Sequence, residues 1–161
     1  MIGKADIGAV DNSSTASIAP PPLALYLHWP FCRTKCPYCD FNSHVANHID
    51  HAGFAAAYRQ EMSHMANLYG RGRHLHSLFL GGGTPSLMPP SLVEEIVEMA
   101  ETLFGFEADI EITLEANPTS SEANSLADMV TAGVNRFSLG LQSLDDAGLA
   151  FLGREHSAAE A

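Results

Sequence analysis

The sequence predicts an α/β fold built on a parallel sheet. Three observations lead to this prediction. Short apolar runs alternate with longer segments of helical periodicity, the alternation repeats about four times, and hydrophobic residues make up 46% of the chain against 17% charged residues. Strands that alternate with helices are typical of βαβ units, whose strands run parallel. A composition this apolar also fits a sheet that is buried on both faces.

Each predicted strand is a short apolar run, and each predicted helix follows from its caps and its periodicity. The strands are predicted at residues 23–28, 75–80, 110–114 and 136–139. The helices are predicted at about residues 50–69, 90–104, 119–133 and 143–152. The last strand would then form an exposed edge of the sheet.

The first two helices have clear apolar faces. Asp50 is a suitable N-cap for the first helix, and Gly70 is a suitable stop. Its core face is expected to carry Phe54, Tyr58, Met62 and Met65. The second helix, opened by Pro89 and Pro90, is expected to bury Leu92, Ile96, Met99 and Leu103.

The last two helices are predicted from their caps. Thr119 and Glu122 have the spacing of a capping box, and Gly133 follows the end of that helix. Ser143 is the expected cap of the final helix, with Gly153 at its C-terminus.

Two segments differ in composition. Residues 1–22 are small, polar and end in three prolines, so we expect a disordered lead that offers too little apolar surface to fold. Residues 23–161 are expected to form the ordered domain.

The charge and the apolar pattern exclude several classes of partner. A formal net charge of -11 disfavours binding to nucleic acid or to anionic membranes. No apolar stretch is long enough to span a bilayer, so no integral membrane segment is predicted. The first residues lack the pattern of a secretory signal, and Lys4 is their only basic residue, which also disfavours a transit peptide. We expect a cytoplasmic protein.

All three cysteines, Cys32, Cys36 and Cys39, lie within eight residues. An odd, clustered set does not resemble a disulfide framework. Three thiolates in one loop can hold a [4Fe–4S] cluster and leave one iron without a protein ligand, whereas electron-transfer clusters take four. That iron could bind the amine and carboxylate of an amino acid fragment.

Two alternatives compete with the cluster. Zinc could be bound by Cys36 and Cys39 together with His44 and His48, although the spacing between Cys39 and His44 is short for a zinc finger. A non-catalytic zinc-binding interaction module is therefore the alternative from a different class. A catalytic thiol is a further alternative, but it needs one cysteine rather than three.

Further polar or glycine features follow the ends of the predicted strands. Gly81-Gly82-Gly83-Thr84-Pro85 follows the second strand, Glu115 the third and Gln142 the fourth. The carboxyl edge of a parallel sheet is where ligands bind, and a glycine-rich turn could offer free N–H groups there. A tight strand-to-helix turn explains the glycines equally well.

The single polar residues have ordinary explanations too. Glu115 could simply emerge into solvent, Gln142 could be a loop amide, and Arg154 could be a surface cation near a helix end. His28 is expected to be a hydrogen-bonded core histidine.

The sequence resembles one family over residues 24–156. The similar stretches are YLHWPFC at residues 26–32, CRTKCPYC at 32–39, GGGTP at 81–85, LEANP at 114–118 and GVNRFSLGLQS at 133–143. Together they resemble the radical S-adenosylmethionine proteins that include oxygen-independent coproporphyrinogen III oxidase and the HemW-type heme chaperone. The resemblance implies a partial (βα)6 barrel, of which this chain would hold the first four units and stop before closure.

The resemblance also implies roles for individual residues. Cys32, Cys36 and Cys39 match the ligands of a [4Fe–4S] cluster that has one iron without a protein ligand. The positions that match S-adenosylmethionine contacts are Tyr26, Tyr38, Gly82, Gly83, Thr84 and Glu115. Gln142 and Arg154 match residues that approach a second S-adenosylmethionine in the oxidase.

One difference separates the two branches. The oxidase carries Gly-Cys after the third cysteine, whereas this chain has Asp40-Phe41, as in the heme chaperone branch. The resemblance therefore implies a HemW-like heme chaperone, with heme or a porphyrinogen, an electron donor protein and a heme acceptor as partners. The alternative is the oxidase itself, which decarboxylates a porphyrinogen.

Overall fold

A computed structural model of the chain describes residues 20–118 and 120–161, and the side chains outside residues 119–124. Four parallel strands form the main sheet: β1 (Leu23–Trp29), β4 (Leu75–Gly82), β5 (Phe106–Ala116) and β6 (Arg136–Leu139). They lie in the order β1-β4-β5-β6, so each strand pairs with its neighbour in sequence and β6 is an edge strand. The predicted α/β fold with a parallel sheet is confirmed.

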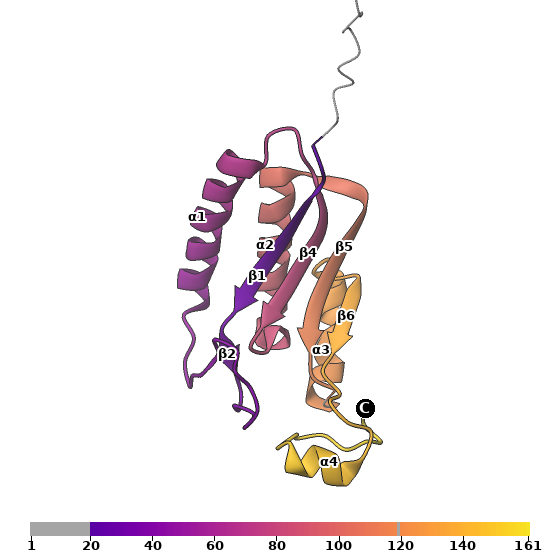
Figure 1. Ribbon diagram of the computed structural model, residues 1–161. Helices are drawn as coiled ribbons and strands as arrows, with labels where there is room; N and C mark the ends of the chain where they lie inside the picture. Colours follow the sequence, from indigo (N-terminus) through magenta and orange to yellow (C-terminus); the bar gives the residue numbers. More distant parts are fainter. Residues whose placement is uncertain (1–19, 119) are drawn as a thin grey trace, which may run out of the picture.

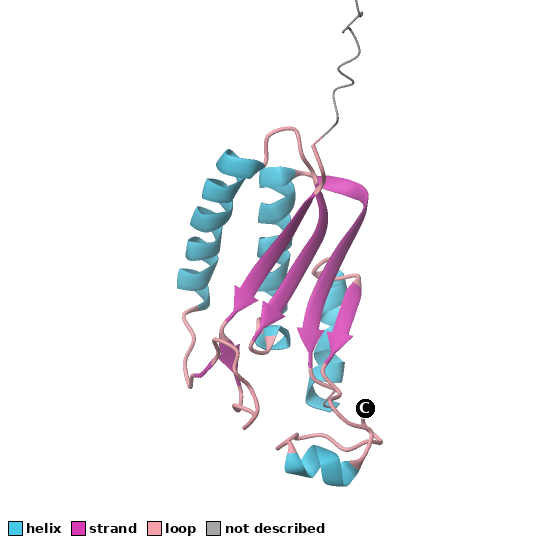
Figure 2. Ribbon diagram, in the orientation of Figure 1, coloured by secondary structure: helices cyan, strands magenta, loops and turns pink. Residues whose placement is uncertain are grey.

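Three helices lie along one face of this sheet (Figure 1). They are α1 (His51–Tyr69), α2 (Pro90–Phe104) and α3 (Ser120–Thr131), and each one connects two successive strands. A short helix, α4 (Asp146–Phe151), lies beyond the C-terminal ends of the strands (Figure 2). Among the described residues, no helix is long and apolar enough to cross a membrane.

The core lies between the sheet and the three helices. On β1, Leu27 and Trp29 are buried against the helices, while Tyr26, which precedes Leu27, is 57% exposed. Alternation along a strand explains this difference, because successive side chains point to opposite faces. The second face of the sheet is not covered by a helix within the described ranges, so the sheet is not buried on both faces as its composition suggested.

The caps of α1 agree with the sequence. The Asp50 carboxylate accepts a hydrogen bond from the Gly53 N–H at 2.9 Å, and the Gly70 N–H donates to the Ala66 carbonyl at 2.9 Å. The expected core face is correct for Phe54, Tyr58 and Met62 but wrong for Met65. Met65 is 38% exposed, because it lies at the border of the face that contacts the core.

Replacing Asp50 with alanine is expected to destabilise the protein by about 1 kcal/mol. The change leaves the Gly53 N–H without its acceptor. The free energy of unfolding in urea measures the effect. Asp50→Asn is the matched control, because it keeps an accepting oxygen and should cost little; equal losses in both variants would contradict the cap.

Two other predicted bounds need correction. Ser143 is not the cap of the final helix: α4 begins three residues later, and the Asp145 carboxylate accepts from the Gly148 N–H at 2.7 Å. The strand predicted at residues 110–114 is longer, since β5 starts at Phe106 with exposed residues that carry no apolar pattern. The second helix matches its prediction, with Leu103 partly buried rather than buried.

The N-terminal lead and the third helix cap are only partly described. Most of the lead predicted over residues 1–22 lies outside the described residues, and so do Thr119 and the side chain of Glu122, the two members of the predicted capping box. Within the described part of the lead, the carbonyls of Pro21 and Pro22 accept hydrogen bonds from Arg73 at 2.7 and 3.3 Å.

Tyr58 joins α1 to the end of β1. Its hydroxyl donates to the His28 carbonyl at 2.8 Å, and burial raises the pKa of Tyr58 from 10.0 to about 12. The predicted core histidine His28 is only half-buried, although both ring nitrogens have partners.

The Tyr58 phenol is therefore expected to titrate near pH 12. Because its pKa is higher in the folded than in the unfolded protein, stability should fall as the pH rises from about 10 to about 12. The difference in ultraviolet titration between the wild type and Tyr58→Phe isolates this group. A midpoint near 10 in that difference would contradict the buried hydroxyl.

Candidate functional site

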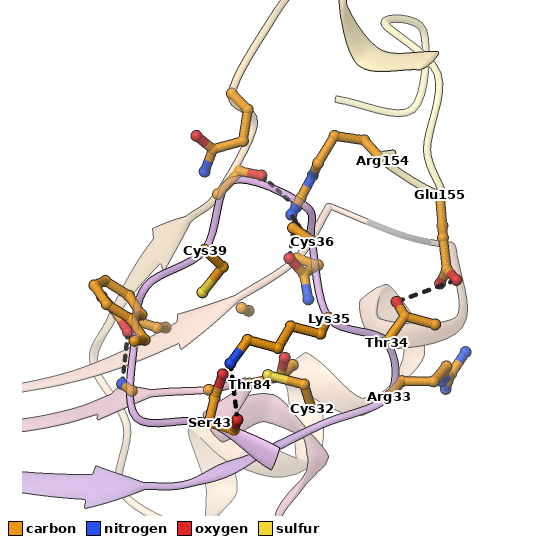
Figure 3. Close-up of a pocket in the computed structure, with 18 of the residues that line it drawn as sticks. Cys32, Arg33, Thr34, Lys35, Cys36, Cys39, Ser43, Thr84, Arg154 and Glu155 are labelled. Atoms are coloured by element: carbon orange, nitrogen blue, oxygen red, sulfur yellow. Dashed lines mark hydrogen bonds between the residues drawn. The ribbon is translucent and has the colours of Figure 1, made fainter. Parts of the chain in front are cut away.

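A cavity of about 380 Å³ lies at the C-terminal ends of the strands (Figure 3). Its walls come from the cysteine loop, the glycine turn after β4, the ends of β5 and β6, and the segment after α4. Cavities that hold a cofactor or small molecule commonly measure about 300–1,000 Å³. The expected convergence of polar features at this edge of the sheet is confirmed.

The cysteine loop is closed at its base by two short strands. β2 (Phe31–Cys32) pairs with β3 (His44–Val45), and this pairing places the residues between them in one loop. Inside the loop, the Cys39 N–H donates to the Cys36 carbonyl at 3.0 Å, which closes a turn with Pro37 at its second position. The Lys35 ammonium donates to the Ser43 carbonyl at 3.3 Å.

The three thiols all line the cavity, and each is half-buried and free of disulfide bonds. Among the described residues, no group of three or more His, Cys, Asp or Glu side chains is gathered so as to hold a metal ion. The four residues considered as zinc ligands are therefore not gathered in this way, and His44 and His48 do not line the cavity. The cysteines of a cubane cluster bind different irons, so they need not converge on one point.

The glycine turn brings β4 close to the cysteine loop. A Cβ at Gly83 would lie 2.6 Å from the Phe31 carbonyl oxygen and 3.0 Å from the Cys32 sulfur. Gly82 has a φ of 118°, a conformation that favours glycine. Because glycine has no side chain, the backbone of the turn after β4 can lie directly against β2, which carries Cys32.

The expectation of free N–H groups in this turn is wrong for three residues. The Gly82 N–H donates to Glu115 at 3.0 Å, the Gly83 N–H to the Trp29 carbonyl at 2.7 Å, and the Thr84 N–H to the Phe31 carbonyl at 2.8 Å. The turn is held by the surrounding strands, so its N–H groups serve the scaffold.

Glu115 and Tyr26 lie near each other but differ in placement. Glu115 is half-buried and lines the cavity, whereas Tyr26 does not line it. The Tyr26 ring stacks on Phe79 at a centroid distance of 5.9 Å, and its hydroxyl lies 3.3 Å from the His28 ring. Partial burial and the nearby Glu115 carboxylate raise the pKa of Tyr26.

Arg154 contacts the cysteine loop and the segments that follow β5 and β6 (Figure 3). Its Nη2 donates to the Asn117 side-chain oxygen at 2.6 Å and to the Gly140 carbonyl at 2.8 Å. Its Nη1 lies 3.5 Å from the Cys36 sulfur and 3.4 Å from the Tyr38 hydroxyl. The Arg154 side chain is therefore half-buried in the cavity wall, and its interpretation as a surface cation is wrong.

Two further candidates, Gln142 and Tyr38, also line the cavity. Gln142 is exposed and has a φ of 68°, which is uncommon for a residue other than glycine. Burial and a hydrogen bond to Cys36 raise the pKa of Tyr38, while the Arg154 charge acts in the opposite direction.

The sequence reasoning missed several residues of the cavity. His156 is 5% exposed, and one ring nitrogen lies 3.2 Å from the Leu141 carbonyl. Glu155 accepts a hydrogen bond from Thr34 at 3.3 Å. Both residues directly follow Arg154 in the sequence, and this proximity could have indicated them as candidates. Ser43 is buried at 3% exposure, and no pattern in the sequence indicated it.

Residues 26–161 match the model of the radical SAM superfamily. The chain belongs to this superfamily. Membership implies a [4Fe–4S] cluster and S-adenosylmethionine as cofactors. The three free thiols and the cavity beside them fit that pair.

Named radical SAM relatives cover most of this chain. A mitochondrial radical S-adenosyl methionine domain-containing protein 1 from Bos taurus is 46% identical over 155 residues, or 95% of this chain and 35% of the relative. The heme chaperone HemW of Escherichia coli is 41% identical over 142 residues, or 88% of this chain and 37% of the relative. The chain thus spans about a third of the length of these relatives.

A solved structure shares the fold. The coproporphyrinogen III oxidase HemN of Escherichia coli, described as a radical SAM enzyme, superposes with a TM-score of 0.77 and 32% identity. The match covers 90% of this chain and 33% of that one. The four strands described here therefore correspond to part of a radical SAM barrel.

Proposed function

We propose that this chain belongs to a HemW-type heme chaperone that holds a [4Fe–4S] cluster and S-adenosylmethionine. The observation that carries the choice of branch is Asp40-Phe41 after Cys39, where the oxidase has a further cysteine. The chain has three cysteines in all, so one iron of the cluster has no cysteine of this chain to bind it. The similarity to the HemW relatives supports the same branch.

In this proposal, different walls of the cavity would hold the two cofactors. Cys32, Cys36 and Cys39 would hold the cluster from the loop side. The glycine turn with Thr84, and Glu115 from β5, would contact S-adenosylmethionine from the sheet side. When bound, the cluster supplies one electron that can cleave a sulfonium.

Three peripheral residues complete the proposed site. Tyr38 would contact the adenosyl part of the cofactor, and Gln142 would lie at the far wall of the cavity. Tyr26 lies outside the cavity wall, so it would act from the open face of the sheet.

We also propose partners and a location for the whole protein. Heme, a heme acceptor and an electron donor protein are proposed for the whole protein, of which this chain matches about a third. The cytoplasmic location is likewise a proposal. The relatives from Bos taurus and Mus musculus are named as mitochondrial proteins.

Anaerobic reconstitution with iron and sulfide tests the cofactor proposal. We expect iron and sulfide without zinc, and binding of S-adenosylmethionine to the reconstituted protein. Stoichiometric zinc without iron would overturn the proposal in favour of the zinc-binding module.

A second pair of assays separates the chaperone from the oxidase, whose structure shares this fold. For the whole protein we expect heme binding, measured by its absorbance change, and no consumption of coproporphyrinogen III under reducing, anaerobic conditions. Turnover of coproporphyrinogen III to protoporphyrinogen IX would overturn the chaperone in favour of the oxidase.

A further inference from the structure

The three cysteine sulfurs do not have equivalent surroundings. The Cys36 sulfur has the Arg154 guanidinium 3.5 Å away. For Cys32 and Cys39, no hydrogen bond to the sulfur is found among the residues whose side chains the structure describes. A cluster held by this loop would therefore have one ligand with a cationic donor and two without.

The guanidinium is fixed in place by other segments. Its Nη2 holds the Asn117 side chain and the Gly140 carbonyl at 2.6 and 2.8 Å, so two strand ends position it. Neighbouring contacts hold the loop against the same segment. Thr34 donates to Glu155 at 3.3 Å, and Pro37 lies against Gly153. These contacts hold the Arg154 guanidinium in position beside the Cys36 sulfur.

A charged donor changes the electronic properties of a thiolate ligand. Hydrogen bonds to the sulfurs and the net charge near a cluster set its reduction potential. The reduced cluster carries one more negative charge than the oxidised cluster. A positive N–H donor at a ligand sulfur therefore stabilises the reduced form more than the oxidised form.

We propose that Arg154 is a positioning residue that donates a hydrogen bond to the Cys36 ligand and raises the reduction potential of the cluster. This inference rests on the proposed function, since it requires a cluster at the three cysteines. It gives Arg154 a role in the loop itself, separate from any contact with S-adenosylmethionine.

The test is a redox titration of the reconstituted protein with dithionite, followed by electron paramagnetic resonance and without S-adenosylmethionine. We expect Arg154→Met to lower the ratio of reduced to oxidised cluster about tenfold at a fixed potential, a shift of about 59 mV to more negative values for one electron. Arg154→Lys should shift the potential in the same direction but by less. Lysine keeps the positive charge but lacks the planar guanidinium whose several N–H groups bind Cys36, Asn117 and Gly140 together.

Thr34→Val is the matched control. It removes the neighbouring contact to Glu155 without changing any charge, and it leaves Arg154 beside Cys36. Its potential should equal that of the wild type. An equal shift in Thr34→Val and Arg154→Met would overturn the inference in favour of a general effect of loop position.

The remaining outcomes are also decisive. A wild-type potential in Arg154→Met with full iron content would overturn the inference. If Arg154→Met fails to bind the cluster, a wild-type potential in Arg154→Lys would overturn it instead. A wild-type protein that assembles no cluster contradicts the proposed function, and the iron content reveals that case before any titration.

Discussion

Replacing any one of Cys32, Cys36 and Cys39 with serine is expected to abolish the iron–sulfur cluster and leave the sheet intact. Iron in such clusters is bound by thiolates, and a serine hydroxyl is a poor substitute. With three cysteines in the chain, no spare thiol can replace the missing ligand. The cysteines are absent from the hydrophobic core, so their loss should not destabilise the helices and strands.

Iron and sulfide content after anaerobic reconstitution measures this effect, and far-ultraviolet circular dichroism checks the fold. Thr34→Ser is a suitable control, because it introduces no new ligand type and lies in the same loop. A serine variant that keeps the iron content of the wild type would show that its cysteine is not a ligand.

Gly83→Ala is expected to have the next largest effect, through the position of Cys32. The new methyl group would lie 2.6 Å from the Phe31 carbonyl oxygen, which belongs to the backbone and cannot rotate away. Either β2 or the glycine turn must move, and overpacking of this kind typically costs about 1–3 kcal/mol. Because β2 ends at Cys32, the iron content should fall together with the stability.

Gly140→Ala provides the matched control for this prediction. Gly140 lines the same cavity, but a Cβ there would approach the flexible Gln142 side chain at 3.4 Å. Urea unfolding and iron content are measured on both variants. Equal behaviour of the two variants would contradict the close approach of β4 to the cysteine loop.

Local signals in the sequence predicted most of the scaffold. Asp50 and Gly70 predicted the two ends of α1 correctly, because caps act within a few residues of the helix end. The position of the cysteine loop and of Glu115 followed from strand ends that the apolar runs marked. The start of β5 was missed because the exposed residues 107–109, which follow Phe106, have no apolar alternation to reveal the strand.

Contacts between distant segments could not be predicted from the sequence. The Gly82 N–H meets Glu115 across 33 positions, and Arg154 meets Cys36 across 118. Such pairs depend on strand order and register, which no single segment encodes. For the same reason Tyr26, assigned to the site by resemblance, lies on the open face of the sheet beside Phe79 and outside the cavity wall.

The closure of the cysteine loop by two-residue strands affects how the metal centre can be assembled. Pairing of Phe31–Cys32 with His44–Val45 involves few hydrogen bonds outside the main sheet, and segments of this kind open at a lower free-energy cost than the core. We therefore expect the scaffold to fold first and to admit iron and sulfide through local opening of the loop. In small zinc domains, by contrast, metal binding and folding are a single equilibrium. The apoprotein should accordingly be a folded acceptor for cluster assembly.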